Sequence, residues 1–114
     1  MTLEEVSQVC MEKFPNLVKQ IYIQDARRNR IRLILVDDSF LDIHQNPNQR
    51  YSYHWQQGDI SYRFNNAPHY DQVETTPHHF HDQDNNVHDS PVLGVTPSDI
   101  TVVLRFVDSH LSKK

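Results

Sequence analysis

Hydrophobic residues recur at helical spacing at both ends of the chain and alternate with polar residues between them. Apolar side chains three and four residues apart predict an amphipathic helix at residues 2–14 and a second one whose apolar stripe runs from Ile100 to Leu111 and ends in Lys113 and Lys114. Thr2 and Glu5 have the spacing of a capping box, so we expect the first helix to begin there. Pro97-Ser98 is the expected cap of the second helix.

Between the two helices the period of the pattern falls to two, which is typical of strands with one buried face. Turn-forming runs of Asp, Asn, Ser, Pro or Gly separate five such stretches. We expect strands at residues 17–23, 30–36, 40–45, 50–56 and 60–65. Strands joined by short turns form an antiparallel meander. The pattern therefore predicts an α+β fold, a five-stranded sheet with both helices on one face.

The hairpin of the fourth and fifth strands shows the clearest separation of apolar and polar residues onto opposite faces of the sheet. A two-residue turn at Gln57-Gly58 puts every apolar residue of the hairpin on one face. On the other face His54 then lies beside Ser61. Ser52 likewise lies beside Arg63. Side chains alternate between the two faces along a strand. A shift of the turn by one residue therefore leaves the same residues on the polar face.

After the fifth strand the apolar periodicity disappears, and we expect residues 67–91 to form a long loop before the last helix. A structureless connection of this length is usually functional or disordered. It holds three of the six prolines. It also holds five of the eight histidines: His69, His78, His79, His81 and His88.

Composition narrows the classes of function. Of the 114 residues 37% are apolar, so we expect residues 1–114 to form one small domain. The net charge of −4 argues against indiscriminate nucleic-acid binding. Gly58 and Gly94 are isolated, which excludes Gly-rich phosphate loops. Cys10 is the only cysteine, which excludes an intramolecular disulfide and a cysteine-rich zinc site.

No apolar run approaches the roughly 20 residues that a membrane span requires. We therefore expect a cytoplasmic protein without a membrane partner. The sequence leaves the oligomeric state open, a homodimer included.

Histidine carries the candidate chemistry, because its side chain changes charge near neutral pH and acts as general base or acid without a metal. His54 and Arg63 share the polar face of the hairpin, and the chain continues from the fifth strand into His69. An arginine among histidines suits a phosphodiester, whose negative charge grows in the transition state. These residues predict cleavage of RNA by its own 2′-hydroxyl group.

Each candidate receives a role in this hypothesis. We expect His54 and His69 to be the base and the acid, and Arg63 to stabilise the phosphate. His79 and His81 are expected to close the pocket from the loop.

Structural roles compete with these assignments. His54 can be an ordinary surface residue, and Arg63 an ordinary cross-strand contact. The aromatic residues of the hairpin share its apolar face, so core packing is favoured over base stacking for Tyr51, Tyr53, Trp55, Tyr62 and Phe64. A solvated turn is the default for four nearby arginines, which could otherwise grip a phosphate backbone: Arg27, Arg28, Arg30 and Arg32.

The loop histidines also admit a metal site. His78, His79 and His81 lie near Asp71 and Asp82, and such side chains are competent ligands of zinc or nickel. Their spacing is not diagnostic, so we expect a metal-independent reaction. The alternative is a non-catalytic module whose loop becomes ordered on a metal ion or a partner protein. A transcription-coupled subunit is a third hypothesis, and no helix-turn-helix pattern supports it.

Three runs of the chain form a pattern: RYSYHWQ at residues 50–56, YRFNNAPH at 62–69 and TPHHFH at 76–81. Together they resemble the TumE-like family of small prokaryotic toxins from toxin–antitoxin modules. The resemblance implies a toxin that acts on RNA and is paired with a helix-turn-helix antitoxin. It adds four residues as substrate contacts: Tyr53, Tyr62, Asn66 and His78. Asn65 and Tyr70 depart from the family pattern, so neither is expected to be an indispensable acid or base.

Overall fold

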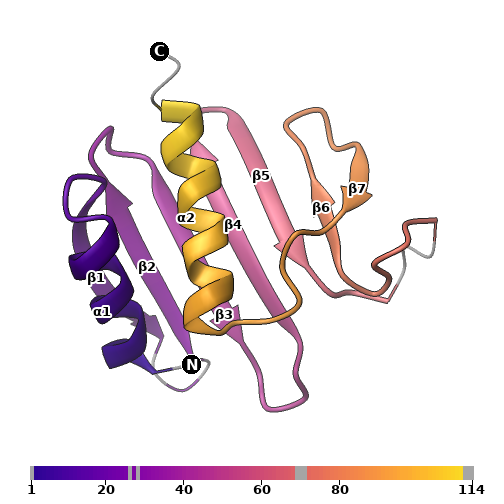
Figure 1. Ribbon diagram of the computed structural model, residues 1–114, viewed down its shortest axis with the longest axis horizontal. Coiled ribbons are helices and arrows are strands. Elements are labelled where there is room, and N and C mark those ends of the chain that lie inside the picture. The colour runs from indigo at the N-terminus through magenta and orange to yellow at the C-terminus, as the bar shows by residue number, and fades with distance from the viewer. Residues whose placement is uncertain (1, 26, 28, 69–71, 112–114) are drawn as a thin grey trace.

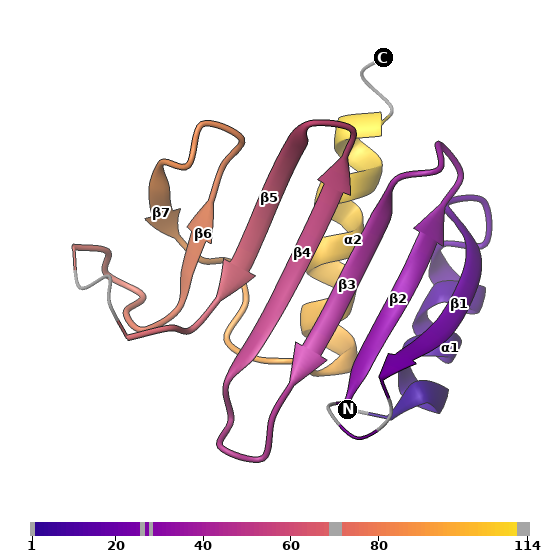
Figure 2. The same ribbon diagram turned by 180° about the vertical axis from the view of Figure 1, so that it is seen from behind.

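The computed structural model describes residues 2–25, 27, 29–68 and 72–111. Two helices, α1 (Leu3–Lys13) and α2 (Pro97–Leu111), enclose a run of strands in the chain. The strands are β1 (Val18–Asp25), β2 (Arg30–Leu35), β3 (Phe40–Gln45), β4 (Tyr51–Gln57), β5 (Ile60–Asn65), β6 (His79–His81) and β7 (Val87–Asp89). Both helices lie against the same face of the sheet (Figure 1). Seen from behind, the other face carries no helix among the described residues (Figure 2).

The sheet is an antiparallel meander in the order β1-β2-β3-β4-β5-β6-β7. Over the described residues it has seven strands, so the expectation of five strands was wrong. The two additional strands lie within residues 67–91, which we expected to be a loop throughout. Each has only three residues, too few for a period of two to emerge from the sequence. Strand β6 continues the sheet because Phe64 pairs with Phe80.

The first helix begins as its sequence predicts. Thr2 Oγ1 accepts a hydrogen bond from the Glu5 backbone N–H, and Glu5 Oε1 accepts one from the Thr2 N–H, both at 3.1 Å. The second helix is capped one residue earlier than expected. The Asp99 N–H donates to Thr96 Oγ1 at 3.2 Å, so Thr96 is the cap, and Pro97 occupies the first helical position, where its missing N–H costs nothing.

The β4–β5 hairpin keeps the predicted faces but not the predicted turn. Gln57 pairs with Ile60, so the turn is Gly58-Asp59, one residue later than expected. Gly58 has a φ of 58°, a conformation that glycine adopts without strain. The shift pairs His54 with Arg63 instead of Ser61, while parity keeps each side chain on its predicted face.

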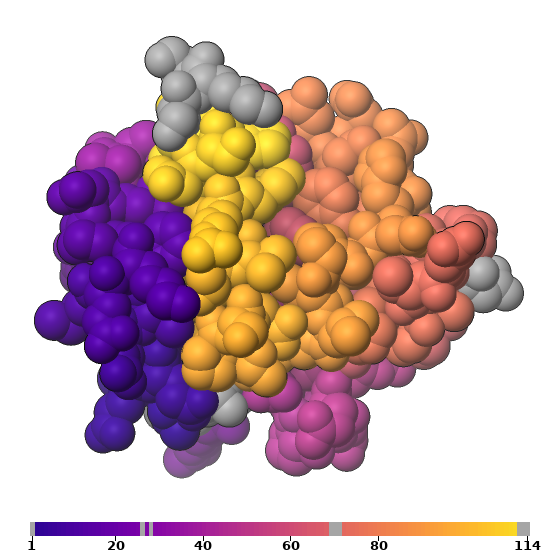
Figure 3. Space-filling model, viewed as in Figure 1, coloured from indigo at the N-terminus to yellow at the C-terminus, as the bar shows by residue number. Residues whose placement is uncertain are grey.

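The core fills the space between the sheet and the helices, which pack against each other over it (Figure 3). The Trp55 ring stacks on Tyr62 at 5.2 Å and meets the edge of Phe106 at 6.2 Å. Its buried Nε1–H donates to Ser39 Oγ at 2.9 Å, which offsets the cost of removing the indole from water. Within the described part of the chain, neither helix is long and apolar enough to cross a membrane.

Candidate functional site

A row of polar residues crosses the sheet face opposite the helices, which we call the open face. Each member is the direct cross-strand partner of the next: Arg32, Asp42, His54, Arg63 and His81. Directly opposed side chains point to the same face, with Cβ atoms roughly 5 Å apart. The row therefore gathers residues that are far apart in the chain onto one surface.

Arg32 and Asp42 form the structural end of this row. Arg32 Nε and Nη2 donate to the two Asp42 carboxylate oxygens at 2.7 and 2.8 Å, and the guanidinium lies 3.9 Å from the centre of the Phe40 ring. The hydrogen bonds to Asp42 raise the pKa of Arg32, so the guanidinium keeps its charge and the Asp42 carboxylate balances it. Arg32 therefore has a structural role within the sheet.

Arg63 differs from Arg32 in its surroundings. Its side chain is exposed, and no hydrogen bond or ion pair joins it to another residue within the described ranges. It lies between His54 on β4 and His81 on β6. Arg63 therefore presents an available positive charge on the open face.

His54 is half-buried and oriented by its own strand. Its Nε2 lies 3.0 Å from Gln56 Oε1, two residues along the same face. An amide oxygen only accepts, so Nε2 carries the hydrogen of this contact. The contact leaves Nδ1 as the ring nitrogen that can exchange a proton with a substrate.

His79 and His81 stand on the other side of Arg63. Their rings lie 4.8 Å apart, and their side chains are buried. Phe80 between them points to the helix face, where its ring lies 4.6 Å from that of Phe64, so the two histidines point toward the open face. Burial, followed by the charges of His79 and Arg63, lowers the pKa of His81. His81 is therefore neutral at pH 7.

The third histidine of this run is separated from the other two. His78 Nδ1 lies 2.9 Å from Tyr51 Oη, and the two rings stack with centres 5.8 Å apart. Burial lowers the pKa of His78. In the ranges that the structure describes, no three His, Cys, Asp or Glu side chains are grouped so that they could hold a metal ion. The remaining candidate, His69, lies outside the described residues.

The residues added by the family resemblance make contacts within the fold. Tyr53 is fully buried on the helix face, and its hydroxyl donates to the Gly94 carbonyl at 2.9 Å. Tyr62 is also buried there. Asn66 Oδ1 accepts from the Tyr51 N–H at 3.0 Å, and its amide donates to the Gln49 carbonyl at 2.8 Å. Core packing explains the two tyrosines, and loop anchoring explains the asparagine.

A basic hollow of about 760 Å³ lies beside the ends of β2 and β3. Among the described residues its lining contains no carboxylate and consists of Arg27, Asn29, Arg30, His44, Gln45, Asn46, Pro47 and Gln49. Arg30 and His44 begin a second cross-strand row that runs through Ser52 and Asn65 to His79. The sequence predicts a solvated turn for these arginines and gives His44 no part in the site. The position of His44 in its strand could have indicated this, because alternation places His44 on the same face of the sheet as His54.

Comparison with known proteins decides the family. A family model described as Toxin TumE matches residues 10–111, nearly the whole chain. The chain belongs to the TumE toxin family. No curated protein and no solved structure matches it. The resemblance seen in the three sequence runs is thereby confirmed, and TumE membership makes the chain a toxin component with an antitoxin as partner.

Proposed function

We propose that this TumE-family toxin cleaves RNA on the open face, with the RNA 2′-hydroxyl as nucleophile and without a metal ion. The observation that carries the proposal is the position of exposed Arg63 between two histidines in one cross-strand row. A guanidinium fork binds two phosphate oxygens at once. Neighbouring strands are roughly 5 Å apart, so a phosphate held by Arg63 lies within reach of His54.

The chemical step uses a base, an acid and a fixed charge. His54 Nδ1 takes the proton of the 2′-hydroxyl while the O2′–P bond forms. Arg63 stabilises the charge that accumulates on the non-bridging oxygens. An acid, for which we propose His69, donates a proton to O5′ as the P–O5′ bond breaks. The products are a 2′,3′-cyclic phosphate and a free 5′-hydroxyl group.

His81 and His79 form the wall of the site beyond Arg63. Because burial keeps His81 neutral, it places no second positive charge against the guanidinium. This leaves the Arg63 charge for the phosphate. The pair thus supports Arg63 rather than exchanging protons.

The basic hollow extends the proposed RNA path along the same sheet. Arg27 and Arg30 can contact a second phosphate of the strand that occupies the open face. A local group of cations is needed because the net charge of the chain is −4. We propose that the protein acts in the cytoplasm and that its antitoxin is a helix-turn-helix protein, as the family resemblance implies.

The test compares Arg63→Ala with Arg105→Ala, a matched loss of an exposed arginine on α2, far from the open face. Purified proteins are incubated with structured RNA in EDTA and with added zinc. We expect the wild type and Arg105→Ala to cleave in EDTA, and Arg63→Ala to lose at least 100-fold in rate, as for a removed transition-state donor. Equal cleavage by the two variants contradicts the site. Cleavage only with zinc contradicts the metal-independent reaction and favours a metal site instead.

A further inference from the structure

The two edges of the sheet are unequal. Strand β7 has three residues and is a short edge, whereas β1 has eight. Within the described ranges β1 is paired only with β2, so its outer side presents backbone donors and acceptors along the rim of the molecule (Figure 2). Natural sheets block such edges with charges, proline, β-bulges or short strands. Register shifts against β2 flank the middle of β1, but residues 20–23 between them carry none of these features. Tyr22 and Ile23 are 37% and 49% exposed there.

The sequence of β1 is self-complementary about Tyr22. Residues 19–25 read KQIYIQD, so the five inner residues are the same in both directions. In an antiparallel pair of two copies centred on Tyr22, Ile21 lies opposite Ile23 and Gln20 opposite Gln24. At each end Lys19 lies opposite the Asp25 carboxylate of the other copy. A two-fold axis through Tyr22 therefore matches identical or complementary residues along this sequence. The strand is regular from Gln20 to Ile23, with a register shift against β2 on either side.

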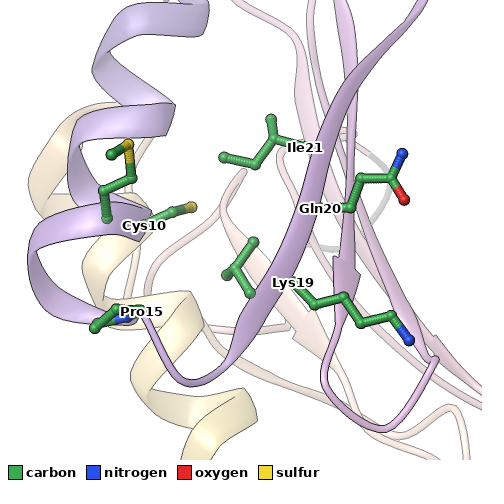
Figure 4. Close-up of a pocket in the computed structure, with 7 residues that line it drawn as sticks. Cys10, Pro15, Lys19, Gln20 and Ile21 are labelled. Atoms are coloured by element: carbon green, nitrogen blue, oxygen red, sulfur yellow. The ribbon is translucent and has the colours of Figure 1, made fainter.

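An apolar groove of about 380 Å³ adjoins this edge. It lies between α1 and β1 and is lined by Met11, Val18 and Ile21 among others (Figure 4). Ile21 points toward α1 across the groove, and Met11 is 73% exposed. In the antiparallel pair, Ile23 of the other copy lies next to Ile21 at the groove. Pairing the edges thus removes apolar surface from water and satisfies backbone groups together.

We propose that two copies of this chain form a dimer by antiparallel pairing of their β1 edges about Tyr22. The two seven-stranded sheets then join into one continuous sheet, with the helices of both copies on one face. Lys19 already forms an ion pair with Asp38 of its own chain. The Asp25 carboxylate, whose Oδ1 accepts a hydrogen bond from the Arg27 N–H of its own chain, approaches the same region in the other copy. Charge complementarity therefore favours this register. This inference does not depend on the proposed RNA cleavage.

The test is a charge exchange measured by sedimentation and native mass spectrometry. The wild type is expected at about 27 kDa, twice the chain mass of 13.5 kDa. Lys19→Glu places two carboxylates opposite each other at both ends of the pair, and Asp25→Lys places two ammonium groups there. Each variant alone is expected to be a monomer. Their equimolar mixture restores opposite charges at both ends and is expected to form a heterodimer of about 27 kDa. Arg105→Glu, a charge reversal of an exposed residue on α2, is the control and is expected to remain a dimer.

Several results overturn the proposal: a monomeric wild type, charge variants that dimerise like the wild type, or folded variants that stay monomeric when mixed. Circular dichroism establishes that each variant is folded. If a charge variant does not fold, the variant Ile23→Lys tests the pairing instead. Ile23 is half exposed, and its replacement places a charge near the centre of the interface. A folded Ile23→Lys protein that dimerises like the wild type contradicts the pairing, and a folded monomer supports it.

Discussion

His54 lies directly opposite Arg63 across the β4–β5 hairpin, on the sheet face away from the helices. The pairing depends on the Gly58-Asp59 turn, which sets the register of the two strands. It places an imidazole ring one strand from an exposed guanidinium. His81 continues the same row on the next strand. The proposed chemistry rests on this geometry.

A substitution of Tyr53 tests whether the helix face of the sheet serves stability and the open face serves RNA cleavage. Its hydroxyl donates to the Gly94 carbonyl within the core, so Tyr53→Phe removes one hydrogen bond and no contact on the open face. We expect the free energy of unfolding to fall by about 1 kcal/mol and RNA cleavage to stay within twofold of the wild type. Urea unfolding and cleavage rates measure the two effects. A large loss of cleavage in a folded variant would instead assign Tyr53 to substrate binding.

The pKa of His81 gives a pH-dependent prediction. Burial, then His79 and Arg63, hold it below the ordinary value of 6.5. Arg63→Gln removes one neighbouring positive charge, so we expect the His81 pKa to rise in an NMR titration. Arg105→Gln, on the other side of the protein, is expected to leave it unchanged. A His81 pKa that does not respond to Arg63→Gln would show that the two side chains do not interact.

The same pKa predicts how stability changes with pH. Because the folded-state pKa of His81 is lower than the unfolded one, the unfolded chain binds the proton first as pH falls. The free energy of unfolding therefore decreases below about pH 6.5, and His81→Asn should reduce that decrease. Urea unfolding at pH 7.5 and pH 5 measures it. An unchanged pH dependence in the variant would remove His81 as a source of the effect.

Ser39 supports the largest buried side chain. It accepts the Trp55 indole hydrogen bond, and Trp55 is 1% exposed. Ser39→Ala leaves this donor buried without its acceptor, so we expect a loss of about 2 kcal/mol in the free energy of unfolding. Ser61→Ala, on a half-buried serine of β5, is the control and should change stability little. Equal effects of the two substitutions would argue against the indole hydrogen bond as a source of stability.

Periodicity predicted most of the fold because most elements are long enough to show it. The helices, the first five strands and the face of every residue in the β4–β5 hairpin follow from spacing and parity. The exact turn did not, because Gln57-Gly58 and Gly58-Asp59 put the same residues on each face. Only the structure shows that the partner of His54 is Arg63.

The loop was where sequence reasoning failed. His79, Phe80 and His81 alternate between polar and apolar, and the Asp- and Asn-rich run that follows contains Asn85 with a φ of 63°. These are signals of a short hairpin, but three residues per strand are below what a period can establish. The separation of His78 from His79 and His81 follows from this alternation, which a loop does not impose.

The most direct test of the account asks which hydroxyl group attacks the phosphate. A short RNA cut at one mapped position is compared with the same RNA carrying a single 2′-deoxy nucleotide on the 5′ side of that position. We expect the wild-type toxin to convert the first into a 2′,3′-cyclic phosphate and a 5′-hydroxyl fragment, and to leave the second uncut at that position. Equal cleavage of both substrates would contradict attack by the 2′-hydroxyl and with it the proposed roles of His54 and Arg63.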